Sequence, residues 1–173
     1  MEQVHPEMVT LEPDVEAALL AALHLRHEDL MPGQRPKLAF NGDGRMLVPI
    51  RNEAVLVSLD PDQEALARLS TTLKIVGFYC FVVKSGERHA AVRMFAPAYG
   101  IPEEAATGMM AGPLGFWLSR VAGLPGLEFR IEQGRLMKPA SPSLLDVRLE
   151  DSNLWVGGRA KGMRHLECEV NRP

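Results

Sequence analysis

Cysteine is scarce in this 173-residue chain, and its two cysteines stand far apart. Cys80 lies in an apolar stretch, and Cys168 lies near the C-terminus. A disulfide-stabilised domain or a structural zinc site needs more cysteines, or cysteines and histidines at short spacings. The sequence therefore predicts idle or buried thiols in a reducing, cytoplasmic compartment.

Long apolar runs and clusters of basic residues are also missing. No segment approaches the roughly 20 apolar residues of a membrane span. The first residues are acidic and lack the basic start and apolar middle of a signal peptide. Lysine and arginine are scattered, and the formal net charge is −3. We therefore expect neither a membrane nor a nucleic acid as a partner.

Aromatic residues make up only 6% of the chain, but 46% of its residues are hydrophobic and 24% are charged. This composition is ordinary for a globular protein. The length is sufficient for one well-buried core.

Two amphipathic helices are predicted in the first half of the chain. In Pro13–Leu25, apolar residues recur at i, i+3, i+4, i+7 and i+8, and Pro13 suits the first helical position. A second helix begins at Asp60, which can cap it, and extends to about Val76. Met1–Glu12 shows no period and is predicted to be an extended lead.

β-Branched and aromatic residues indicate strands in much of the remaining sequence. The predicted strands are Lys37–Phe40, Arg45–Ile50, Ala54–Leu59, Phe78–Lys84, Ala90–Phe95, Leu127–Ile131, Leu144–Leu149 and Leu154–Val156. Turn formers at residues 41–44 and 85–86 join neighbouring strands as hairpins. Antiparallel-style strands with two or three helices make the predicted fold class α+β.

Several reactive side chains lack the partners that would make them a site. His24 and His27 lie three residues apart near the end of the first helix, without an obvious third ligand. A favourable position in the helix dipole explains them better than a metal does. Ser119 and Ser141 have no His-Asp partners in the sequence. We therefore expect neither a metal nor a cofactor.

The stretch His89–Leu118 combines features that can form a binding site. A buried strand leads into a proline-rich loop, where Glu103 and Glu104 place two carboxylates beside each other. Thr107 and Gly108 then precede an apolar helix. The unpaired N–H groups and the dipole at a helix start favour carboxylate or phosphate groups.

The start of this helix has two interpretations. With Thr107 as N-cap, Pro113 falls inside the helix and removes the hydrogen bond to the Met109 carbonyl. Alternatively, the helix begins near Gly112, after a turn rich in donors. Either arrangement presents amides to an anion. The helix is apolar on nearly all sides, so the sheet must enclose it.

Some of these side chains also have a purely structural interpretation. The two glutamates are either an acid or base in a cleft, or solvated acids in a surface loop. Arg93 either pairs with a loop glutamate or faces outward from its strand. Met109 and Met110 either lie at the site or fill gaps in the core.

Three motifs in the same order resemble the phenazine-biosynthesis PhzF-like family. They are RMFAPAYGIPEEAATG followed by GPLG, IEQGRLMKPAS, and the segment Trp155-Val156-Gly157-Gly158. The resemblance covers roughly Lys37–Met163. It implies the diaminopimelate-epimerase-like fold, in which each of two similar domains is a curled, mostly antiparallel sheet around a central apolar helix. The active site of such proteins lies in the cleft between the domains.

The resemblance also implies roles for four residues. Glu104 stands where the family has an aspartate near the substrate, and it would assist catalysis. Thr107, Gly108 and Met109 would hold a substrate carboxylate. The family has serine in place of Met109, and a thioether cannot donate a hydrogen bond, so only the backbone donors remain there.

The chain is shorter than two-domain members of this family, and motifs of their first domain, including the segment with the catalytic glutamate, are not found. We expect residues 1–36 to form a lead with the amphipathic helix, and residues 37–173 to form a single domain like the family's C-terminal domain.

Two functions follow. The first is half of a cofactor-independent isomerase or epimerase for a small carboxylate-bearing metabolite, whose principal acid or base comes from another chain. The second is a non-catalytic anion-binding or assembly module. The expected partner is a second copy in a homodimer or a chain carrying the missing N-terminal domain.

Overall fold

The computed structural model describes residues 1–159, which fold as an α+β protein. The strands are β1 (Glu2–Val4), β2 (Glu7–Thr10), β3 (Lys37–Asn41), β4 (Asp43–Pro49), β5 (Ile75–Val83), β6 (Ala90–Ala96), β7 (Ile101–Glu104), β8 (Glu128–Gln133), β9 (Ser143–Leu149) and β10 (Asn153–Gly158). The helices are α1 (Pro13–Ala22), α2 (Glu53–Ser58), α3 (Gln63–Leu73) and α4 (Gly108–Arg120), with 3₁₀ turns η1 (His27–Asp29) and η2 (Pro97–Tyr99).

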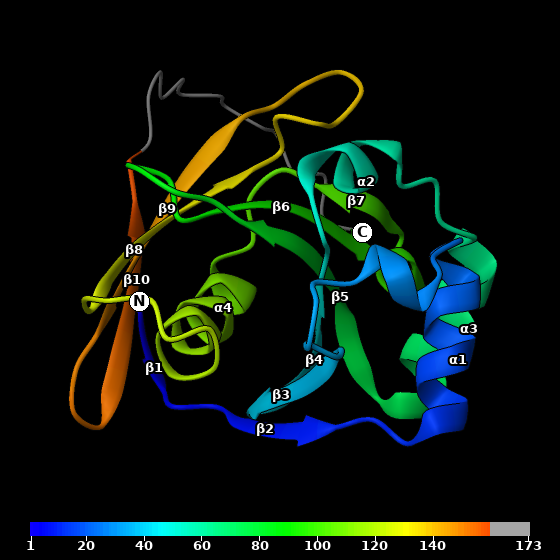
Figure 1. The fold of residues 1–173 in the computed structure, drawn as a ribbon, viewed down its shortest axis with the longest axis horizontal. Coiled ribbons are helices and arrows are strands. Elements are labelled where there is room, and N and C mark those ends of the chain that lie inside the picture. The colour runs from blue at the N-terminus through cyan, green and yellow to red at the C-terminus, as the bar shows by residue number, and fades with distance from the viewer. Residues whose placement is uncertain (160–173) are drawn as a thin grey trace, which may run out of the picture.

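All ten strands belong to one curled sheet (Figure 1). Its order is β1-β10-β9-β8-β6-β5-β4-β3-β2, and β7 pairs with β6 outside this path. The pairs β4–β5 and β6–β8 are parallel, and the other pairs between these strands are antiparallel. The predicted hairpin of β5 and β6 is confirmed, since Val83 pairs with Ala90. The prediction of a curled, mostly antiparallel sheet is therefore confirmed.

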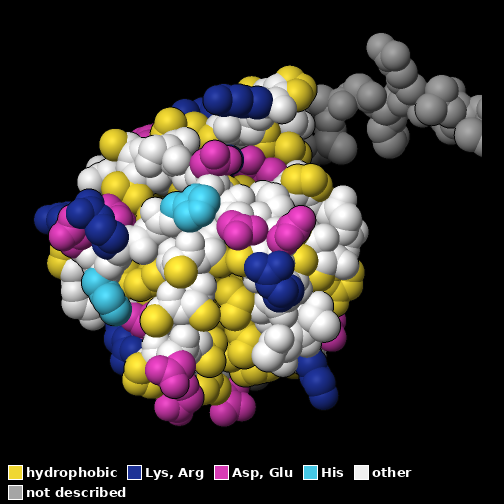
Figure 2. All heavy atoms as spheres, turned by 90° about the vertical axis from the view of Figure 1, so that its right-hand side faces the viewer, with side chains coloured by type: hydrophobic (Ala, Val, Ile, Leu, Met, Phe, Trp, Pro, Cys, Tyr) yellow, Lys and Arg dark blue, Asp and Glu magenta, His cyan; other side chains and the backbone are white. Residues whose placement is uncertain are grey.

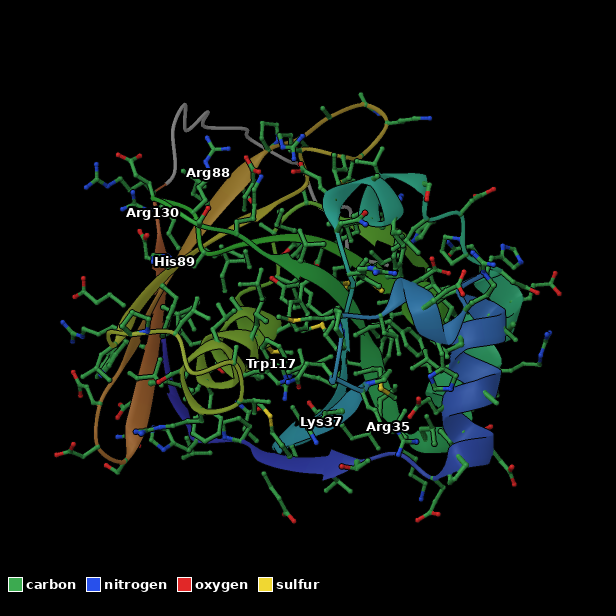
Figure 3. The ribbon with its side chains drawn as sticks, viewed as in Figure 1. Arg35, Lys37, Arg88, His89, Trp117 and Arg130 are labelled. Atoms are coloured by element: carbon green, nitrogen blue, oxygen red, sulfur yellow. The ribbon has the colours of Figure 1, made fainter. Side chains whose placement is uncertain are left out.

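Helix α4 lies inside the curl, as its apolar sequence predicts (Figure 1). Met110, Leu114, Trp117 and Leu118 are fully buried. Trp117 packs its ring edge-on against Phe81 of β5, with ring centroids 4.8 Å apart. Figure 3 shows Trp117 pointing from α4 into the enclosed space. The inner face of the sheet and this helix form one of two hydrophobic cores.

The second core lies between the outer face of the sheet and the layer of α1, α2 and α3. Figure 2 shows this helical side of the molecule, where acidic and basic side chains are scattered among hydrophobic ones. Within residues 1–159, no helix is both long and apolar enough to cross a membrane.

Helix α1 buries most of the predicted face, since Leu19, Ala22 and Leu23 are buried, but the match is not complete. Ala18 is exposed, whereas Glu16 is buried together with Leu19 and Leu20. Arg35 explains the difference, because its Nη2 lies 2.6 Å from Glu16 Oε2 and its Nε donates to the same oxygen at 2.7 Å. A carboxylate can be buried when a cation pairs with it. The helix also ends at Ala22, three residues earlier than predicted.

The predicted strand Ala54–Leu59 is wrong, because this segment forms α2. Asn52 caps the helix, and its Oδ1 accepts the Val55 N–H at 3.0 Å. Short apolar runs do not distinguish a strand from a buried helix. The cap at Asn52 decides in favour of a helix.

Helix α3 begins two residues later than a cap at Asp60 implies. Asp62 is its N-cap, and Asp62 Oδ1 accepts the Ala65 N–H at 2.9 Å. The carbonyl of Asp60 instead accepts a hydrogen bond from His24 Nδ1 at 2.7 Å. Asp60 and His24 thus join the ends of two helices.

The predicted N-terminal lead is extended, but it forms two strands of the sheet. Strand β1 pairs with β10 at one edge, and β2 pairs with β3 at the other. The Met1 ammonium donates to the Val156 carbonyl at 2.8 Å, and the Val156 N–H donates back to Met1 at 2.8 Å. The first ten residues therefore bridge the two edges of the curl. The proposed division between residues 36 and 37 stays a prediction.

The structure describes one of the two cysteines. Cys80 on β5 is buried, as predicted, and burial raises the pKa of its thiol. Cys168 lies outside the described residues, as does most of the segment after β10.

Candidate functional site

The segment between β6 and α4 is more regular than the predicted loop. Residues 97–99 form the 3₁₀ turn η2, and β7 follows and pairs with β6. Glu103 and Glu104 thus lie on a short strand rather than at a loop tip. Pro102 is compatible with this strand because β7 is an edge strand, where a missing N–H is tolerated.

Glu103 is not a solvated surface acid, because it is the glutamate with which Arg93 pairs, as one of the two interpretations of Arg93 predicted. It forms a two-point ion pair with Arg93, with Nε to Oε1 at 2.9 Å and Nη2 to Oε2 at 2.7 Å. Arg93 Nη1 also donates to the Leu59 carbonyl at 2.6 Å. The side chains of Arg93 and Glu103 are only 11% and 16% exposed. This pair fastens β7 to β6 and to the end of α2.

Glu104 makes a different contact from its neighbour. The Thr107 hydroxyl donates to Glu104 Oε2. Glu104 Oε1 accepts no hydrogen bond from residues 1–159, and the residue is partly exposed. Successive side chains of a strand point to opposite faces, which explains why adjacent carboxylates meet different partners. Of the two glutamates, Glu104 is the one with an oxygen available to a ligand.

Helix α4 begins at Gly108, with Thr107 in the N-cap position and Pro113 inside the helix. The first of the two interpretations is therefore confirmed. The N–H groups of Met110 and Ala111 donate to the Thr107 carbonyl at 3.2 and 3.1 Å. Those of Gly108 and Met109 donate to no group within the described part of the chain. Two amides thus remain open beside Glu104.

Met109 and Met110 differ in their exposure to solvent. Met110 is fully buried, in agreement with the core interpretation, whereas Met109 is 42% exposed. Met109 thus lies at the surface where the open amides are, and its thioether adds no donor there.

Sequence reasoning assigned no role to Gln133, although it lies at the centre of this region. Gln133 ends β8, is fully buried, and makes four hydrogen bonds to Tyr79, Glu104 and Thr107. Burial, with a smaller contribution from the Glu104 charge, raises the pKa of Tyr79, so its phenol remains a donor. The sequence feature that could have identified Gln133 is the EQG motif, in which two polar residues follow the predicted strand Leu127–Ile131.

A hollow along β8 and β9 does not include Glu104. It has a volume of about 920 Å³, and its lining includes Arg88, Arg130, Glu132 and Asp146. Figure 3 shows Arg88, His89 and Arg130 at one end of the sheet, away from Trp117. Two of its cations are paired, Arg88 with Glu132 and Arg130 with Asp146, and Arg159 also lines it. Glu104 does not line this hollow, so the candidate site is an open surface around the start of α4.

His24 and His27, near the end of α1, contact different partners. His24 contacts Asp60, whereas His27 Nδ1 lies 3.6 Å from Glu16 Oε1. Among residues 1–159, no three His, Cys, Asp or Glu side chains are arranged to hold a metal ion.

Solved structures of similar fold include two relevant relatives. A PhzF-family phenazine biosynthesis protein from Bacillus anthracis superposes with a TM-score of 0.72 and 19% identity, over 90% of this chain and 55% of that one. A predicted epimerase from Pseudomonas aeruginosa superposes with a TM-score of 0.71 and 25% identity, over 91% of this chain and 54% of that one. The curled sheet around α4 is therefore the diaminopimelate-epimerase-like fold.

Curated sequences agree with this result. The uncharacterised isomerase YddE of Escherichia coli is 32% identical over 167 residues, which cover 92% of this chain and 56% of that protein. A trans-2,3-dihydro-3-hydroxyanthranilate isomerase of Pseudomonas chlororaphis is 34% identical over 172 residues, 99% of this chain and 54% of that protein. This chain thus spans about half the length of these relatives. The family described as phenazine biosynthesis-like protein matches residues 1–164, and the chain belongs to this PhzF family.

Proposed function

We propose that this chain supplies one wall of the active site of a PhzF-type isomerase or epimerase that acts on a small carboxylate-bearing molecule. The observation that carries the proposal is the juxtaposition of one available carboxylate, Glu104, with the open N–H groups of Gly108 and Met109. Relatives named as isomerases support the reaction class.

The open amides would bind the substrate carboxylate. The start of α4 adds the partial positive charge of the helix dipole to these two donors. Thr107 fixes the turn from which they point, because its carbonyl accepts the N–H groups of Met110 and Ala111. Met109 would contribute its backbone N–H and an apolar contact instead of a side-chain donor.

Glu104 would assist proton transfer from one face of the substrate. Moving a proton along a carbon framework requires a base on one face and usually an acid on the other or further along. The second group would come from a polypeptide that resembles the family's first domain and covers the open surface around α4. This arrangement agrees with a chain that spans half of its curated relatives. A reduced, buried Cys80 supports a cytoplasmic location.

Deuterium exchange from solvent into a panel of small amino-acid-like carboxylates tests this function. The chain should be assayed alone and with the first-domain part of a relative such as YddE. We expect exchange at the level of the buffer blank for the chain alone and clear exchange for the mixture. Glu104→Gln should lower that exchange by about 10²–10⁴-fold, the usual contribution of a general base. Glu64→Gln, on the exposed side of α3, is the matched control.

Two results would contradict the proposal. A mixture that binds but gives no exchange above the blank would remove the catalytic assignment. Exchange that survives in Glu104→Gln would show that another group transfers the proton.

A further inference from the structure

The EQG motif of residues 132–134 has no part in the function proposed above. Gln133 is nevertheless a polar side chain with no exposed surface, placed 26 residues from Thr107 and 54 from Tyr79 in the sequence. Burying an amide is costly unless its groups are hydrogen-bonded. The pattern of its four bonds is therefore informative.

The direction of the Gln133 amide is determined by its neighbours. Its Oε1 accepts the backbone N–H of Thr107 at 3.1 Å and the hydroxyl of Tyr79 at 2.9 Å. Its Nε2 donates to the Glu104 carbonyl at 2.7 Å. A backbone N–H can only donate and a backbone carbonyl can only accept. The reversed amide would place donor against donor and acceptor against acceptor, so one orientation remains.

The remaining hydrogen of Nε2 points to the Thr107 hydroxyl at 2.9 Å. Because that hydroxyl accepts from Gln133, its single hydrogen is directed to the other neighbour, Glu104 Oε2. The three side chains thus form a chain of hydrogen bonds with one direction. It runs from the Gln133 amide through the Thr107 hydroxyl to the Glu104 carboxylate.

We propose that Gln133 is a positioning residue for the reaction. Through the Thr107 hydroxyl it holds Glu104 Oε2 in one place and leaves Oε1 for the substrate. This inference rests on the proposed catalytic role of Glu104. Orientation of a reacting group matters because a displacement of about 1 Å can cost about 10²-fold in rate.

Residues near Gln133 also contact the turn that carries Glu104 and Thr107. Gly134 has φ +79°, and a Cβ there would lie 2.1 Å from the Ser141 carbonyl oxygen and 2.8 Å from that of Ala105. The Ser143 hydroxyl donates to the Ala105 carbonyl at 2.6 Å. The chain after β8 therefore packs directly against the turn that carries Glu104 and Thr107. Any displacement of Gln133 would be transmitted to that turn.

Two variants break the hydrogen-bond chain without changing side-chain shape. In Gln133→Glu, the new carboxylate has no donor for Thr107 and competes with Glu104 for its hydroxyl hydrogen. In Thr107→Val, the hydroxyl is lost but the backbone N–H that Gln133 accepts is kept. Thr107→Ser restores the hydroxyl, and Gln34→Glu, in the loop before β3, is the matched control for the charge change.

Steady-state exchange by the chain mixed with the first-domain polypeptide gives the first readout. We expect kcat to fall about 10–100-fold in Gln133→Glu and in Thr107→Val, with KM changed less than threefold. The double variant should be no slower than the slower single variant, because both changes break the same chain. Gln34→Glu should keep kcat within about threefold of wild type, and Thr107→Ser should recover most of the kcat that Thr107→Val loses. Additive losses, or a change in KM alone, would overturn the inference.

The second readout needs no activity, so it separates this inference from the proposed function. NMR side-chain couplings of Glu104 in the chain alone should indicate one rotamer in wild type and averaging in Thr107→Val. If the mixture never shows exchange but the couplings change as expected, the catalytic proposal fails and the positioning contact stands. Unchanged couplings in Thr107→Val would overturn the positioning role, and they remain measurable if Gln133→Glu does not fold.

Discussion

At the scale of single residues, Glu103 and Glu104 show how neighbours with the same side chain acquire different tasks. Both carboxylate oxygens of Glu103 bind Arg93, whereas Glu104 Oε1 remains available to a ligand. Their adjacency was visible in the sequence, and so was the possibility that Arg93 pairs with one of them. Which of the two glutamates pairs with Arg93 was not visible, because it depends on which side of β7 each side chain lies relative to β6.

Substitution of Arg93 tests the structural role of its ion pair with Glu103. Arg93→Met leaves the Glu103 carboxylate unpaired at a largely buried position. The free energy of unfolding should fall by about 3–5 kcal/mol, the usual cost of stranding one partner of a buried pair. Glu104→Gln should change it by less than about 1 kcal/mol. Urea unfolding followed by circular dichroism measures both, and equal effects would show that the pair does not fasten β7.

The open amides of α4 predict weak anion binding by the isolated chain. During a titration with sulfate or citrate, the amide signals of Gly108 and Met109 should shift the most, because their N–H groups have no internal acceptor in residues 1–159. The amides of Met110 and Ala111, which are bonded to Thr107, are the internal controls. Unchanged shifts at residues 108 and 109 would exclude this anion site.

At the scale of elements, sequence patterns predicted most strands and the enclosure of α4. They failed at α2, where a local cap decides, and at Glu16 and Gln133, where distant contacts decide. The segment that became α2 carries an apolar run that fits either state, and only the Asn52 cap selects the helix. The burial of Glu16 on α1 depends on Arg35, nineteen residues away. Gln133 was missed because its partners are also distant in sequence and lie on β5, β7 and the start of α4.

Close packing of α4 against β9 depends on a glycine. A Cβ at Gly115 would lie 2.5 Å from Val147 Cγ1 and 3.0 Å from its Cβ. Gly115→Ala should therefore destabilise the fold by about 1–3 kcal/mol through overpacking, despite the better helix propensity of alanine. Gly108→Ala, in the same helix, meets only ordinary contacts at 3.5 Å or more and serves as control. Thermal unfolding that ranks the two variants in the opposite order would contradict this packing.

An ion network joins α2 to the ends of β5 and β8. Hydrogen bonds from Lys84 and then Arg135 lower the pKa of Glu53, and Arg135 also pairs with Glu132 at 3.0 Å. A lowered pKa in the folded state adds stability at neutral pH that is lost as the pH falls below the ordinary glutamate value of about 4.3. Glu53→Gln should therefore unfold with a weaker pH dependence below that value. Identical pH profiles for variant and wild type would exclude this contribution.

At the scale of the whole molecule, the first ten residues decide how far the sheet closes. Strands β1 and β2 occupy opposite edges, so one short segment ties β10 to β3. Gln3 strengthens the closure, because its Nε2 donates to the Gly108 carbonyl at 3.1 Å and its Oε1 accepts from Asn41 at 3.0 Å. The sequence predicted an extended segment there. It did not predict the strand pairing, because strands of three and four residues are too short to show a periodic pattern.

The open surface at the start of α4 predicts that the isolated chain associates. The proposed active site is open on the side of α4 where Met109 is 42% exposed, and a surface shaped to meet a partner domain is rarely left uncovered. We expect the isolated chain to self-associate at high micromolar concentration, most simply as a two-fold dimer. Light scattering should then give about twice the 19.1 kDa of one chain, and Met109→Glu should weaken the association by placing charge on that surface. Addition of the first-domain polypeptide should replace the homodimer by a mixed pair, because both partners would compete for one face. A clean monomer at this concentration, or a dimer that Met109→Glu leaves intact, would place the contact elsewhere or remove it.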